Sequence, residues 1–112
     1  MLNKYAMADV ELIEATAKQV WGNDVEFGEL KVLRSPFPEF EWPVRLYGQV
    51  DVEFGYDRST LGITVPKDGE YVFMRTYTDK PYFIGLASMK AENLLHNFYI
   101  LDEVVREHLL DL

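Results

Sequence analysis

The feature that most constrains the fold is a long alternation of apolar and polar residues over 44–56. One parity is apolar and holds Val44, Leu46, Gly48, Val50, Val52, Phe54 and Tyr56. The other parity holds Arg45, Tyr47, Gln49, Asp51, Glu53 and Gly55. Side chains of a β-strand point alternately to its two faces, so this period predicts a long strand with one buried and one solvated face.

The residues before this strand predict a helix, a second strand and a loop. Ala6, Val10, Ile13, Ala17, Val20 and Trp21 recur at helical spacing, which indicates a helix over 4–21 that stops at Gly22. Residues 25–34 read as a strand whose apolar parity switches at Gly28, as a bulge would produce. Residues 35–43 hold three prolines, and we expect a rigid loop or an edge segment there.

The residues that follow the predicted long strand indicate short strands and a C-terminal helix. Turn sequences at 57–59, 66–69 and 78–81 separate three expected strands, which cover 61–65, 70–77 and 82–87. A helix is expected over 89–110 with Ser88 as its N-cap. Its main apolar stripe consists of Leu94, Phe98, Leu101, Val105, Leu109 and Leu112.

This order of elements predicts an α+β fold. An N-terminal helix precedes a sheet of four or five mainly antiparallel strands, and the C-terminal helix packs on that sheet. We expect residues 1–112 to form a single α+β domain, since 112 residues leave no room for two cores. The chain has no cysteine, which excludes disulfides and thiolate metal sites. It also has no membrane-length apolar run, and acids stand where a signal peptide would be apolar, so a cytoplasmic protein is expected.

No motif in the sequence identifies a reaction. His96 and His108 are the only histidines, and twelve residues of helix place them about 18 Å apart, too far to share a metal ion. The pairs Glu39/Glu41 and Asp51/Glu53 alternate with apolar residues, as on any solvated strand face. We therefore expect no catalytic residues, no metal and no cofactor.

The charge of the chain points to a class of partner. Nineteen acids against eleven bases give a net charge of −8, and residues 24–70 hold ten of the acids and five of the bases. Such a chain is a poor ligand for phosphate backbones, so we expect no direct binding to nucleic acid. The excess either keeps the protein soluble or steers it toward a basic protein partner.

The expected partner-binding residues combine large rings with acids. Phe37, Phe40 and Trp42 lie in the proline-rich segment beside Glu39 and Glu41. Rings on a rigid loop make good interface anchors, although they could equally fold back and cap the core. The outer face of the long strand adds Tyr47, Asp51 and Glu53 to this set.

A second contact surface is expected on the closing helix. His96, Ile100, Val104 and His108 form one ridge at i, i+4 spacing, opposite the main apolar stripe. The apolar side chains of Ile100 and Val104 on that side are expected to be buried by another part of the protein. Either the first helix supplies it, or a second copy of the chain does in a homodimer.

These features predict a non-enzymatic binding protein that blocks or escorts a basic partner. In composition it is similar to small acidic immunity proteins, inhibitors and secretion chaperones of bacteria and phages. One alternative is a small-molecule-binding domain with a pocket between the sheet and the C-terminal helix. That pocket would be lined by polar groups such as Tyr71, Tyr77, Tyr82 or His96. Another alternative is a structural component of an oligomeric assembly.

Overall fold

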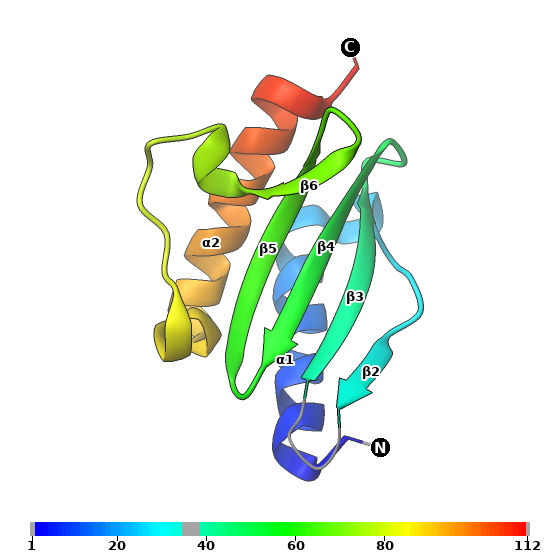
Figure 1. The fold of residues 1–112 in the computed structure, drawn as a ribbon, viewed down its shortest axis with the longest axis vertical. Helices are drawn as coiled ribbons and strands as arrows, with labels where there is room; N and C mark the ends of the chain where they lie inside the picture. The colour runs from blue at the N-terminus through cyan, green and yellow to red at the C-terminus, as the bar shows by residue number, and fades with distance from the viewer. Residues whose placement is uncertain (1, 35–38, 112) are drawn as a thin grey trace.

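The computed structural model describes residues 2–34 and 39–111 (Figure 1). Its order is α1 (Lys4–Trp21), β1 (Val25–Phe27), β2 (Lys31–Arg34), β3 (Glu39–Leu46), β4 (Val50–Asp57), β5 (Thr60–Lys67), β6 (Glu70–Phe73) and α2 (Ala91–Val104). The strands pair in the order β1-β3-β4-β5-β6, β2 also pairs with β3, and every pair is antiparallel. The predicted α+β fold is confirmed, with six strands in place of four or five.

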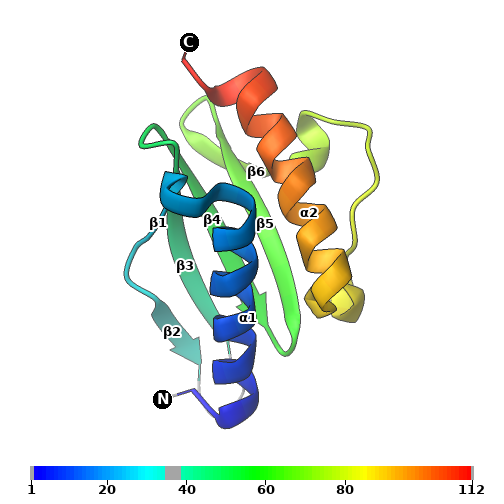
Figure 2. The ribbon, with the colours of Figure 1, turned by 180° about the vertical axis from the view of Figure 1, so that it is seen from behind.

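Both helices lie on the same face of the sheet (Figure 2). The α1 helix has the predicted bounds. The Asn3 side chain accepts the Ala6 N–H at its start, and Gly22 ends it with a φ of 56°. The predicted stripe of α2 is buried at Leu94, Phe98 and Leu101. The ring of Phe98 stacks on Phe54 of the sheet with centroids 5.2 Å apart, so α2 closes the core against β4.

The prediction of a single strand over 44–56 is wrong, because these residues belong to two strands, β3 and β4, that form a hairpin. The turn runs through Tyr47 and Gly48, both at positive φ. Leu46 pairs with Val50, so residues of equal parity stay on one face across the turn. The alternation therefore continues through the hairpin, and all its apolar members except Gly48 are buried.

The predicted loop over 35–43 is also wrong from residue 39 onward, where β3 lies between β4 and the pair β1 and β2. Pro43 is tolerated in this inner strand because its missing N–H points to the gap between β1 and β2. The Pro43 carbonyl points the same way and accepts the Gly28 N–H at 2.8 Å. A Cβ on Gly28 would lie 2.8 Å from the Pro43 ring, so this close approach requires glycine. The expected strand over 25–34 is thus split at Gly28.

The predicted strand over 82–87 is replaced by an irregular segment and a 3-10 helix at Gly85–Met89. Strand β6 also ends at Phe73 rather than continuing to residue 77. Asn97 of α2 takes the place of a strand neighbour, because its side-chain amide bonds both the N–H and the C=O of Phe83. The prediction of Ser88 as an N-cap is wrong. Its hydroxyl donates to the Gly85 carbonyl and accepts the Leu61 N–H.

In the described part of the chain, neither helix is both long and apolar enough to cross a bilayer.

Candidate partner-binding face

Among the described residues, no second layer covers the face of the sheet opposite the helices, and we call it the open face (Figure 1). Cross-strand partners point to the same side of a sheet, so the strand register identifies its residues. By this register its acids are Glu26, Glu39, Glu41, Asp51, Glu53 and Asp57, and its bases are Lys31, Arg34 and Arg45. The open face is therefore strongly acidic, while the opposite parity forms the core.

One end of the open face is internally neutralised. Arg45 on β3 donates to both carboxylate oxygens of its cross-strand partner Asp51, at 2.8 and 3.2 Å. This guanidinium lowers the pKa of Asp51 below its ordinary value. Both side chains are about half exposed, so we expect the pair to add little stability.

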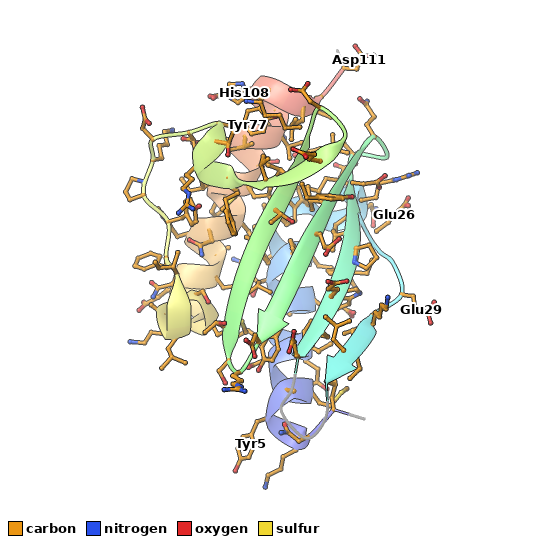
Figure 3. The ribbon with its side chains drawn as sticks, in the orientation of Figure 1. Tyr5, Glu26, Glu29, Tyr77, His108 and Asp111 are labelled. Atoms are coloured by element: carbon orange, nitrogen blue, oxygen red, sulfur yellow. The ribbon has the colours of Figure 1, made fainter. Side chains whose placement is uncertain are left out.

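The middle of the open face holds a shallow acidic hollow. It measures about 440 Å³ and is lined by Glu29, Lys31, Glu41, Pro43 and Glu53. Glu29 lies beside the sheet in the gap between β1 and β2 (Figure 3). Three carboxylates against one ammonium leave this hollow negative. Among the described residues, none of these three glutamates forms an ion pair.

Two rings border the acids on the open face, although the sequence predicted Tyr71 only as a pocket-lining residue and did not single out Phe73. Tyr71 and Phe73 of β6 are 51% and 50% exposed. Phe73 continues the cross-strand row of Glu53 and Thr64. Partial burial and the charges of Asp51 and Glu53 raise the pKa of Tyr71. Both parities of residues 70–77 contain large apolar side chains, so only the strand register reveals which rings face solvent.

Two of the aromatic anchors predicted from the sequence, Phe40 and Trp42, are not on this face. Phe40 and Trp42 are 0% and 4% exposed, and they face the helices. They occupy the core parity of β3, whereas Glu39 and Glu41 occupy the solvent parity. Their prediction as docking anchors is therefore wrong, and the alternative that they fold into the core is confirmed. Phe37 lies outside the described residues.

Tyr47 belongs to a different cluster, at the β3–β4 turn. Its hydroxyl donates to the Asp102 carboxylate, and the Arg106 guanidinium lies 5.2 Å from its ring centroid. Burial, followed by the bond to Asp102, raises the pKa of Tyr47. Tyr47 thus joins the turn to α2.

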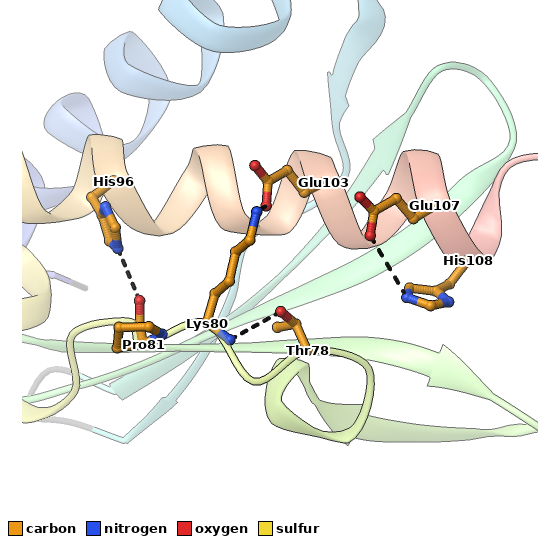
Figure 4. Close-up of polar contacts among 7 residues, drawn as sticks. All are labelled: Thr78, Lys80, Pro81, His96, Glu103, Glu107 and His108. Carbon is orange, nitrogen blue, oxygen red and sulfur yellow. Dashed lines mark hydrogen bonds and ion pairs between the residues drawn. The ribbon is translucent and has the colours of Figure 1, made fainter.

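The ridge on α2 is covered by the chain itself, along residues 77–84 (Figure 4). Ile100 and Val104 are 6% and 1% exposed. Three pairs tie the covering segment to this side of α2: the Pro81 carbonyl to His96 at 2.9 Å, Lys80 to Glu103 at 2.6 Å, and the Tyr77 ring to His108. Cover by the first helix is therefore wrong, and the ridge offers no apolar surface for a homodimer.

Within residues 2–34 and 39–111, no group of three or more His, Asp or Glu side chains is arranged to hold a metal ion. No family model matches the chain, and neither the curated proteins nor the solved structures contain a significant match to it.

Proposed function

We propose that this protein is a non-enzymatic binding protein whose open face takes a basic segment of a protein partner, which it blocks or escorts. One observation carries the proposal. Both helices lie on one side of the sheet, and the positions that the strand register assigns to the uncovered side hold six acids against three bases. A solvated sheet face needs polar residues, but it does not need this imbalance of sign.

The chemistry of the open face suits lysine and arginine side chains. The hollow around Glu29, Glu41 and Glu53 offers carboxylates that no base of the described chain neutralises. The half-exposed rings of Tyr71 and Phe73 beside it can contact the aliphatic stems and the cationic ends of such side chains. A field of one sign also speeds the encounter with a partner of opposite sign.

The proposal is tested by titrating the labelled protein with a lysine-rich peptide and recording amide NMR shifts. We expect the shifts to concentrate on β3, β4 and β6 and to fade at high salt. The double variant E41K/E53K should bind about tenfold more weakly, since each exposed charge contact contributes up to about 1 kcal/mol.

The matched control is E11K/E14K on α1, which brings the net charge from −8 to the same −4. We expect its affinity to stay within about threefold of the wild type, because these acids lie on the helix side. If both double variants lose affinity equally, or if the shifts fall on the helices, binding follows net charge alone and the proposal is wrong.

A further inference from the structure

A pocket lies at the outer edge of β5, away from the acidic hollow. The pairing of β4 with β5 extends to Asp57 and Thr60, but that of β5 with β6 ends at Thr64 and Phe73. The outer edge of residues 60–63 therefore faces the pocket rather than a described strand. The pocket measures about 260 Å³, and its far wall is the irregular segment that includes Tyr82, Ile84 and Gly85.

The walls of this pocket are mainly apolar and partly open to solvent. Leu61, Ile63 and Met74 are buried and form its inner side. Phe73 and Ile84 stand at its mouth, 50% and 76% exposed. The Asn97 amide is already bonded to the backbone of Phe83, so it holds the far wall in place. Exposed apolar side chains gathered around a concavity are typical of a binding site.

The rim of the pocket carries one charged side chain, Arg75. Its guanidinium carbon lies 4.9 Å from the centroid of the Phe73 ring. Within the described residues Arg75 forms no ion pair, although the chain has nineteen acids. An arginine without a carboxylate, held over an aromatic ring beside an apolar pocket, is complementary to an anion with an apolar body.

We propose that this pocket binds a carboxylate that carries an aromatic or branched apolar body. The body lies between Phe73 and Ile84, and the carboxylate pairs with Arg75. The volume is sufficient, because a cavity of about 150 Å³ already accepts a benzene ring. A free small acid and the C-terminal residue of a peptide share this chemistry. The site shares Phe73 with the border of the open face, but its charge contact is made by Arg75 and not by the acids of that face.

The test compares 3-phenylpropanoate with its neutral amide, and a short peptide ending in phenylalanine with its C-terminal amide. Binding is followed by amide NMR shifts at 0.15 M salt, where the repulsion from the net charge is largely screened. We expect shifts at Ile63, Arg75 and Gly85, and about fivefold tighter binding of each carboxylate than of its amide.

The variant R75Q should abolish that preference, while R75K should keep part of it. The control K18Q removes an exposed base on α1, far from the pocket lining, and should leave the preference intact. The variant F73A should weaken the acid and the amide alike, because it removes a wall rather than a charge.

Comparing 3-phenylpropanoate with the peptide also identifies the source of the ligand. Tighter binding of the peptide points to a chain terminus, and equal or tighter binding of 3-phenylpropanoate points to a free acid. Equal binding of acids and amides by the wild type would overturn the proposal. Shifts away from the pocket, or a preference that survives in R75Q, would overturn it as well.

Discussion

Replacing Asp102 with alanine is expected to lower the free energy of unfolding by about 3 kcal/mol. Its carboxylate joins three separate elements. It accepts the indole N–H of Trp21 at the end of α1 at 2.9 Å, the hydroxyl of Tyr47 at the β3–β4 turn, and the Arg106 Nε–H at 2.9 Å. Only 18% of its side chain is exposed, so the alanine variant leaves partly buried donors without an acceptor.

Urea denaturation followed by circular dichroism measures this loss. The variant D102N keeps one acceptor oxygen, and we expect it to lose about half as much stability. The control is E103A, the next residue of α2, whose ion pair with Lys80 is about half exposed and should contribute less than 1 kcal/mol. A D102A variant that unfolds at the same urea concentration as E103A would show that the cluster adds nothing specific.

The second large effect is expected at Asn97, which is 2% exposed. Its side chain accepts the Phe83 N–H at 2.8 Å and donates to the Phe83 carbonyl at 2.9 Å. The variant N97L keeps the branched shape of the side chain but leaves both backbone groups without these bonds. We expect a loss of about 2–3 kcal/mol, because each unsatisfied buried polar group costs about 1–3 kcal/mol.

The effect of N97L should be local before it is global. Native-state hydrogen exchange should show the Phe83 amide exchanging at least tenfold faster, while amides of β4 change only by the loss of global stability. The control N93A removes a bond from the Asn93 side chain to the Ala87 carbonyl, at the start of α2. In N93A the Phe83 amide should remain protected from hydrogen exchange. An unchanged Phe83 amide in N97L would contradict the assigned role.

The sequence patterns predicted which side of each strand is buried better than where the strands end. Strand parity depends only on alternation, and the pairing of Leu46 with Val50 carries that alternation through a turn without interruption. The helix over 4–21 was predicted with the correct bounds, because its apolar residues recur at helical spacing and Gly22 supplies a local stop signal.

Long-range bonds explain the errors. Pro43 fits an inner strand only because Gly28 bonds its carbonyl where β1 has ended. Phe83 needs no strand neighbour, because the side chain of Asn97, fourteen residues further along the chain, bonds both its N–H and its C=O. Neither contact leaves a local pattern in the sequence.

The sequence predicted the acidic residues of the candidate site but not its aromatic residues. The acids Glu41, Asp51 and Glu53 alternate with core residues, so their exposure followed from parity. Phe40 and Trp42 share the core parity, but the neighbouring prolines suggested a loop and so obscured it. Only the pairing with β5 assigned Tyr71 and Phe73 to the open face; from the sequence, Tyr71 was expected to line a pocket and Phe73 was not singled out.

The central claim is that the open face, and not the helix side, meets a basic protein. The most direct measurement places a photo-crosslinking amino acid at position 53 of the full chain in its own cells, and at position 11 in a matched strain. Glu53 lies on the open face and Glu11 on α1. We predict a discrete adduct with a basic protein from position 53, lost in the E41K background, and none from position 11. Adducts from position 11 alone, or the same adduct from both positions, would contradict the account.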